Sequence, residues 1–166
     1  MLYVIADNIH KDKNPYLIKE SHRFYATNNS DKAKGHIAAY ASKRAEPYIK
    51  NMTREEIHSY LQEAFRNPDK IVIPESDYGN YRIHLLRQNI PVEKGQTVYL
   101  VVGGFGTQIS EFYASVNKDE AKKKFEELYH RFGNGGPLDD DYFTDGKSYE
   151  NFPYTFDGCI IECVCD

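Results

Sequence analysis

A block of the sequence occurs twice in this chain, and this internal repeat constrains the possible folds more than any other feature. Residues 24–40 align without gaps on residues 112–128, with 7 identities over 17 positions. Such a repeat predicts that one supersecondary unit is built twice and that the two copies bury a shared core. The identical pairs are Phe24/Phe112, Tyr25/Tyr113, Ala26/Ala114, Asn29/Asn117, Asp31/Asp119, Ala33/Ala121 and Lys34/Lys122.

Each copy of the repeat follows an apolar run that is rich in β-branched and aromatic residues, which favours a strand. These runs cover residues 2–6 and 97–102. Turn-forming residues then lead into the shared block, over residues 7–20 in the first copy and through the glycines of residues 103–106 in the second. Each copy is therefore predicted to begin with a β-hairpin.

The shared block also predicts one helix in each copy. A side-chain oxygen can accept hydrogen bonds from the backbone N–H groups that are left unpaired at the start of a helix. Asn29 or Ser30 can do this in the first copy, and Asn117 in the second. Apolar residues then recur at i, i+4, i+7 and i+8, so each helix should have one apolar face. These positions are 33, 37, 40 and 41 in the first copy and 121, 125, 128 and 129 in the second.

The first copy carries an insertion that predicts an additional helix. Residues 53–56, with the sequence Thr-Arg-Glu-Glu, match a capping box, and an apolar stripe of helical period follows them as far as Pro68. Closing strands are expected over residues 81–87 and 159–165, and residues 133–157 are expected to form a loop.

The predicted fold class is α+β. Two tandem ββαβ units, residues 1–90 and 96–166, are expected to form a mostly antiparallel sheet with the helices packed on one face and the extra helix inserted in the first unit. The length of 166 residues fits a single domain over residues 1–166. Pairing of the two half-sheets edge to edge would leave few open strand edges.

The alternation of side chains along a strand suggests a second use for the sheet. If Phe24 and Ala26 meet the helix, Tyr25 faces away from it. In the second copy, Phe112 would likewise meet the helix and Tyr113 would face away from it. Two equivalent tyrosines are therefore predicted to stand on an open sheet face.

Charge is distributed unevenly along the chain, which has a net charge of −4. Residues 1–90 hold 14 Lys/Arg and 11 Asp/Glu, whereas residues 91–166 hold 7 and 14, so the two parts carry +3 and −7. Within residues 132–166, Lys147 is the only basic residue among eight carboxylates. Such a surface repels phosphate backbones and attracts basic ones.

No catalytic or metal-binding motif emerges from the six histidines, which occupy separate predicted elements without an i, i+4 pair. The three cysteines, at positions 159, 163 and 165, are expected to pack as small apolar side chains on one face of a strand, while metal binding by these thiols stays open. A calcium loop that starts at Asp139 would place Thr144 where a glycine is required, so a solvated acidic loop is preferred. No cofactor and no metal are predicted.

The acidic segment of residues 138–157 interleaves aromatic side chains with its carboxylates, which suits a docking surface. Together with the two repeat tyrosines it forms the predicted partner-binding surface. The residues assigned to it are Asp139, Asp140, Asp141, Tyr142, Phe143, Asp145, Glu150, Tyr25 and Tyr113.

The order of strand, turn, strand ending in Phe-Tyr-Ala, capped helix and short final strand resembles small proteins of phages and their bacterial hosts. The resemblance covers both halves and is carried by residues 24–26 and 112–114. Those proteins include host-directed inhibitors of the anti-CRISPR kind, which are often acidic, compact and without enzymatic machinery. The resemblance implies a non-catalytic inhibitor or adaptor and transfers no functional residues.

A second likeness is to ADP-ribosyltransferase-type toxins, in which a strand near Phe-Tyr-Ala-Thr also precedes an Ala/Lys helix. It implies an alternative function, an enzyme acting on a nucleotide or NAD-related ligand, with His22, Arg23, Tyr25 and Glu162 as the residues to test. The sequence has no Glu-x-Glu near its end, where Glu162 is the lone candidate acid. A further alternative is a nucleic-acid-binding module that stacks bases on the two exposed tyrosines.

We expect a cytoplasmic binding protein that lacks catalytic activity, located in the host cell if phage-encoded. The apolar run at the start is too short for a signal peptide or membrane span, and the clustered cysteines do not form a disulfide framework. The expected partner is a protein, for example a nucleic-acid-handling protein with a basic groove, since direct binding to nucleic acid is opposed by the net charge. No membrane partner is expected.

Overall fold

The computed structural model describes residues 1–8, 18, 22–44, 53, 55–56, 59, 62, 83–105, 108–132, 148–150 and 156–166. Its elements are β1 (Leu2–Asn8), β2 (His22–Thr27), α2 (Ser30–Arg44), β3 (Ile83–Gln88), β4 (Thr97–Phe105), β5 (Gln108–Ser115), α5 (Lys118–Phe132), β6 (Ser148–Glu150) and β7 (Phe156–Val164). None of the described helices is long and apolar enough to cross a membrane.

The two halves of the chain share one topology. The first half forms an antiparallel sheet in the order β2-β1-β3, and the second forms an antiparallel sheet in the order β5-β4-β7-β6. In both, the first strand is central, the second strand and the closing strand flank it, and a helix follows the second strand. The predicted α+β class and the two ββαβ units are therefore confirmed, and the short β6 extends the three-stranded sheet of the second unit.

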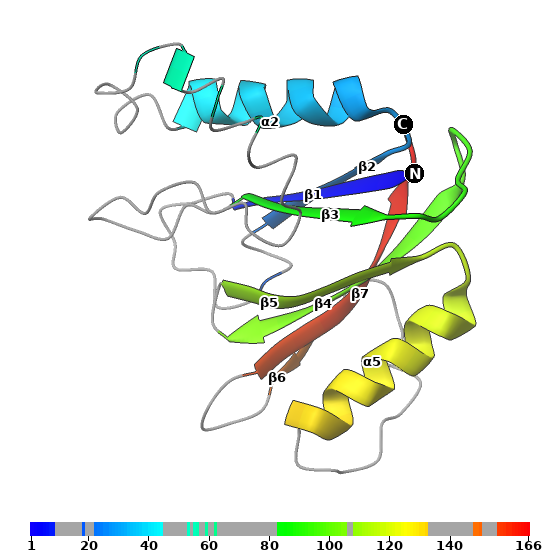
Figure 1. Ribbon diagram of the computed structural model, residues 1–166. Helices are drawn as coiled ribbons and strands as arrows, with labels where there is room; N and C mark the ends of the chain where they lie inside the picture. The colour runs from blue at the N-terminus through cyan, green and yellow to red at the C-terminus, as the bar shows by residue number, and fades with distance from the viewer. Residues whose placement is uncertain are drawn as a thin grey trace.

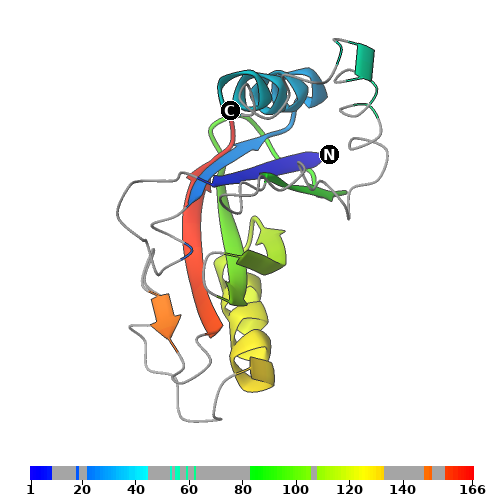
Figure 2. The same cartoon turned by 90° about the vertical axis from the view of Figure 1, so that its left-hand side faces the viewer.

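The prediction of one sheet with both helices on one face is wrong. The two sheets stack face to face, with α2 on the outer face of the first sheet and α5 on the outer face of the second, as Figures 1 and 2 show. The physical reason is that both faces of the central strands are apolar, as expected for strands buried on both sides. Each sheet needs a helix on one face and another apolar surface on the other.

The core between the sheets is built from equivalent strand positions. Leu2 and Val4 of β1 pack in one cluster with Val98 and Leu100 of β4, and all four side chains are buried. The cysteines lie in this layer as predicted: Cys159 and Cys165 are buried, and Cys163 packs beside them. Burial of these apolar side chains is the main favourable contribution to joining the two units.

The helices start as the repeat predicts. Oδ1 of Asn29 accepts hydrogen bonds from the backbone N–H groups of Asp31 (2.8 Å) and Lys32 (3.2 Å), which identifies Asn29 and not Ser30 as the cap. Oδ1 of Asn117 does the same for Asp119 (2.8 Å) and Glu120 (3.3 Å). The predicted apolar face of α5 is confirmed by the burial of Ala121, Phe125, Leu128 and Tyr129.

The capping box of the inserted helix is confirmed. The backbone N–H of Thr53 donates to Oε2 of Glu56 at 2.6 Å, and the backbone N–H of Glu56 donates to Oγ1 of Thr53 at 3.2 Å. Among the described residues of this insertion, Glu55, Glu56, Ser59 and Gln62 are helical.

Several strand boundaries differ from the sequence-based expectations. β1 includes Asp7 and Asn8, which were predicted as the start of a turn. The loop predicted over residues 133–157 contains β6 and the start of β7, because β7 runs the full length of β4. Gly103 and Gly104, predicted as turn residues, lie within β4, where the register with β5 shifts between them. A β-bulge at such glycines is a common way to bend a strand.

Contacts between the units are reciprocal. The rings of the equivalent residues Phe24 and Phe112 meet edge to face with centroids 6.3 Å apart. Gln88 at the end of β3 reaches Ala114 of β5, and the end of β7 reaches Ala26 of β2, which is the repeat equivalent of Ala114. When a residue contacts its own repeat equivalent, both lie near an approximate twofold axis that relates the two units. The units are therefore arranged like the subunits of a symmetric dimer, but within one chain.

The core between the sheets gives a stability prediction. Val98→Ala removes two methyl groups from a side chain that is 0% exposed, and it is expected to lower the free energy of unfolding by about 2 kcal/mol. Val164→Ala makes the same change at a position that is 63% exposed and is expected to cost below about 0.5 kcal/mol. Urea denaturation of both variants measures this difference, and equal costs would contradict the proposed core.

Candidate functional site

Tyr25 faces its own helix, so its predicted place on an open sheet face is wrong. Its ring stacks on the imidazole of His36 in α2, with centroids 4.5 Å apart and an interplanar angle of 7°. The alternation along β2 was predicted correctly, but the sides were exchanged, because Phe24 and Ala26 point toward the second sheet.

Tyr113 repeats this arrangement in the second unit. It packs against the cluster formed by Val101, Phe125 and Leu128 between the sheet and α5, and Lys124 lies over its ring at 5.9 Å from the centroid. Both sheets are thus covered by a helix on one face and by the other sheet on the opposite face. The two tyrosines are partly buried side chains beneath helices, which removes the stacking platform expected for nucleic-acid binding.

The acidic part of the predicted surface lies almost wholly outside the described residues. Asp139, Asp140, Asp141, Tyr142, Phe143 and Asp145 are in this class. The backbone of Glu150 is described in β6, where it pairs with Asp157 of β7. β6 lies at the end of the second sheet and far from α2 in both views (Figures 1 and 2), so the described end of the acidic segment belongs to the second unit.

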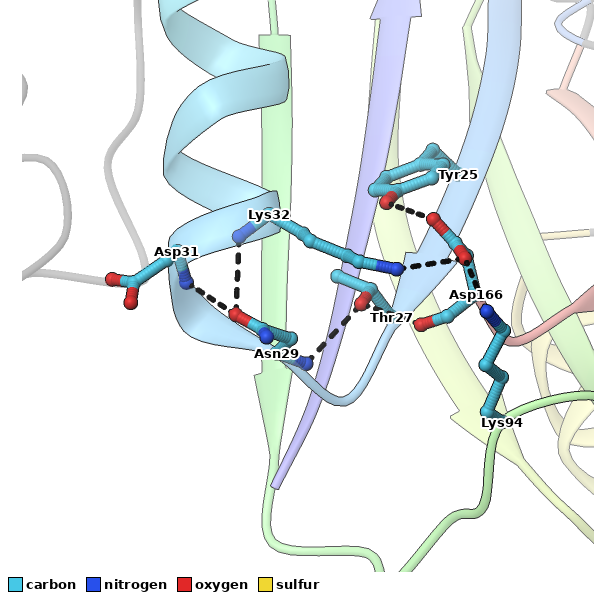
Figure 3. A network of polar contacts seen from close by, with 7 residues as sticks. All are labelled: Tyr25, Thr27, Asn29, Asp31, Lys32, Lys94 and Asp166. Carbon is cyan, nitrogen blue, oxygen red and sulfur yellow. Dashed lines mark hydrogen bonds and ion pairs between the residues drawn. The ribbon is translucent and has the colours of Figure 1, made fainter.

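The described residue with the most polar contacts between units is Asp166 (Figure 3). Its Oδ1 accepts a hydrogen bond from Nζ of Lys32 at 2.8 Å and lies 3.7 Å from Nζ of Lys94. Its Oδ2 accepts a hydrogen bond from the Tyr25 hydroxyl at 3.0 Å. The backbone oxygen of Asp166 accepts a hydrogen bond from the Thr27 hydroxyl at 2.8 Å.

The charges of this cluster stabilise one another. Hydrogen bonds from Lys32 and then Tyr25 lower the pKa of Asp166, and the bond to Asp166 raises the pKa of Lys32. The pKa of Tyr25 is raised first by burial and then by its bond to the Asp166 carboxylate. A tyrosine with a raised pKa stays protonated and acts as a hydrogen-bond donor, so the cluster is a structural ion-pair network and not an activated nucleophile.

The residues assigned to the alternative enzyme do not converge. His22 is buried on the inner face of the first sheet, whereas Arg23 is exposed and points the opposite way. Glu162 lies on β7 of the second sheet, where it accepts a hydrogen bond from Nζ of Lys118 at 3.1 Å. Tyr25 is held by Asp166. Arg23 and Tyr25 share the outer face of β2, His22 lies on the inner face, and Glu162 lies on the other sheet, so the four side chains surround no common reaction space.

His22 is a buried histidine with a strongly lowered pKa. It is 4% exposed, its Nδ1 hydrogen-bonds the Ile18 carbonyl oxygen at 3.1 Å, and its ring lies 6.1 Å from that of His84. Burial lowers the pKa of His22 to about 4, against smaller opposing effects of the Ile18 carbonyl and Asp7. Among the described residues, no group of three or more His, Cys, Asp or Glu could hold a metal ion.

Sequence reasoning missed the Asp166 cluster. Its members come from β2, α2, the turn before β4 and the second residue after β7, and no spacing in the sequence links them. The repeat itself gives a partial signal, because Lys32 replaces the acid found at the equivalent Glu120. A basic residue in the first turn of a helix is unfavourable unless an anion lies close by.

Comparisons with known proteins do not assign this chain to a family. No family model matches the sequence, and no curated protein or solved structure gives a significant match.

The environment of His22 predicts acid sensitivity. The folded-state pKa of about 4 lies below the ordinary value of 6.5, so the unfolded state binds the proton more readily. The stability contributed by neutral His22 is complete above pH 6.5 and decreases as pH falls from 6.5 toward 4. Between pH 7.5 and 4.5 the loss is expected to be about 2 kcal/mol.

Urea denaturation of the natural chain and of His22→Gln at both pH values measures this contribution. The variant cannot be protonated at this position, so its stability is expected to fall less between the two pH values. The same pH dependence in both proteins would show that His22 does not account for the loss.

Proposed function

We propose that this protein is a non-catalytic binding protein that blocks or adapts a macromolecular partner, in the manner of host-directed inhibitors from phages and mobile elements. The binding surface is the acidic, aromatic-rich segment of residues 138–157. The partner is a protein with a basic surface, such as the groove of a nucleic-acid-handling protein. Clustered carboxylates would occupy positions that phosphates normally take.

The charge distribution carries this proposal. Residues 138–157 contain six carboxylates and one basic residue, whereas several of the described charges elsewhere pair with neighbours. Lys118 pairs with Glu162 at 3.1 Å, and Arg131 pairs with Glu111 at 3.3 Å. The segment therefore has a net charge of −5 in its sequence, and charge of one sign acts on a partner over a distance set by the Debye length.

The fold supports the proposal because the acidic segment is not needed to build the core shared by the two units. The stacked sheets and two outer helices account for the apolar residues of both repeats. The acidic segment lies between α5 and β7, where the first unit carries an insertion of different composition, and its strand β6 pairs with β7 at the edge of the second sheet. A surface segment added to a rigid scaffold is a common way for proteins to acquire binding function.

The two alternatives have weaker support. The nucleotide-related enzyme requires His22, Arg23, Tyr25 and Glu162 in one cleft, and these lie on different faces. The nucleic-acid-binding module requires Tyr25 and Tyr113 on an open sheet, and both lie beneath helices. Neither arrangement is present among the described residues.

The proposal is tested by neutralising the acidic segment with a charge-matched control. Partners are captured from a bacterial lysate with the immobilised chain, and the dissociation constant is then measured with the purified partner. The triple variant Asp139→Asn/Asp140→Asn/Asp141→Asn is expected to weaken binding about tenfold at 50 mM salt. Affinity of the natural chain should also decrease at 300 mM salt.

The control variant is Glu55→Gln/Glu93→Gln/Glu126→Gln, which changes net charge by the same amount at three exposed positions outside the segment. It is expected to weaken binding less than about twofold, because scattered exposed charges contribute little. Equal effects of the two triple variants would reject the acidic segment as the binding surface. Salt-independent binding would reject a basic partner.

A further inference from the structure

The stacked sheets meet at two corners that are equivalent in the repeat but differ in chemistry. At one corner, Oε1 of Gln88 accepts a hydrogen bond from the backbone N–H of Ala114 at 3.1 Å. At the other, the backbone N–H of Asp166 donates to the carbonyl oxygen of Ala26 at 2.9 Å, next to the parallel bridge between Ala26 and Cys165. The contact between Gln88 and Ala114 uses a neutral side chain. The contact between Asp166 and Ala26 has ion pairs of the Asp166 carboxylate beside it.

The Asp166 side chain supplies the charged contacts at this corner. Lys32 from α2, Lys94 from the turn before β4, and Tyr25 from β2 all contact its carboxylate (Figure 3). The side chains of Lys32, Lys94 and Asp166 are 42%, 75% and 45% exposed, so dissolved ions can reach them. Ion pairs with this exposure lose strength as the salt concentration rises.

Beyond the Asp166 side chain, few backbone bonds hold the residues after β7 in place. Cys165 donates its N–H to the Gln96 carbonyl oxygen at 2.9 Å and accepts from the N–H of Gly95 at 2.7 Å. Both of these bonds stay within the second unit. The backbone of this segment contacts the first unit at Asp166, whose N–H donates to the Ala26 carbonyl oxygen and whose carbonyl oxygen accepts from the Thr27 hydroxyl at 2.8 Å. The Cys165 thiol also hydrogen-bonds the backbone of Asn28.

We propose that Asp166 is an electrostatic clasp that controls local opening of the corner between β7 and β2, whereas the corner between β3 and β5 stays closed. With the carboxylate charged and salt low, Asp166 fastens the second unit to α2 and β2. When its charge is screened or removed, residues 165–166 separate from β2. This opening exposes the Cys165 thiol, which is 1% exposed in the closed state, and the outer edge of β2.

The test measures local opening with two readouts at 0.05 M and 0.5 M sodium chloride. One is hydrogen exchange of the β2 and β5 backbone amides, and the other is the rate of maleimide labelling at Cys165 resolved by mass spectrometry. In the natural chain, high salt is expected to raise β2 exchange and Cys165 labelling about threefold and to leave β5 exchange unchanged.

Asp166→Asn is expected to show the faster rates already at low salt and to lose the salt response. Hydrogen exchange is the deciding readout for this variant, because the Asp166 charge also affects the Cys165 thiol directly. Burial raises the pKa of Cys165 first, and the nearby Asp166 carboxylate raises it further. A change in labelling without a change in β2 exchange would therefore contradict the clasp.

Gln88→Ala is the matched control at the equivalent corner. It is expected to raise exchange in β5 while β2 exchange and its salt response stay as in the natural chain. A salt response that persists in Asp166→Asn, or that appears equally in β5, would overturn the proposal. Labelling of the buried Cys159 at the same rate as Cys165 would also overturn it, because the opening would then be global.

Discussion

The structure depends on the packing of two equivalent apolar sheet faces against each other. Leu2 and Val4 in the first unit meet Val98 and Leu100 in the second, and Phe24 meets Phe112. A single ββαβ unit can cover one face of its sheet with its own helix but leaves the other face apolar. The second copy supplies the missing surface, which gives a physical reason why the duplication yields one folded body.

The repeat allowed the elements to be predicted but not the way in which the two sheets combine. Hairpins, helix caps at Asn29 and Asn117, the capping box at Thr53 and the inward cysteines all follow from local rules that act over a few residues. Edge-to-edge pairing and face-to-face stacking both satisfy the same strand pattern. What decides between them is that strand residues on both faces are apolar, and this also places Tyr25 beneath α2.

The candidate site also has one part that local sequence predicts, the acidic segment, and one part that it does not, the Asp166 cluster. The acidic segment is evident from composition, because charges that are close in sequence act together wherever the chain runs. The Asp166 cluster is not evident, because Tyr25, Lys32 and Lys94 come to the same carboxylate only after the sheets have stacked. Contacts that depend on tertiary packing leave no periodic signal in the sequence.

Equivalent positions of the two units make different contacts at the start of the helix. In the second unit, the Ser115 hydroxyl donates to Oε2 of Glu120 at 2.8 Å, within the same strand–helix junction. In the first unit, the equivalent acid is replaced by Lys32, and the Thr27 hydroxyl donates instead to Asp166 of the other unit at 2.8 Å. The equivalent hydroxyl therefore makes a contact inside one repeat in the second unit and a contact between repeats in the first. Lys32, which has the opposite charge to the equivalent Glu120, couples the units electrostatically to Asp166 at one corner, and in this contact the two halves of the scaffold differ.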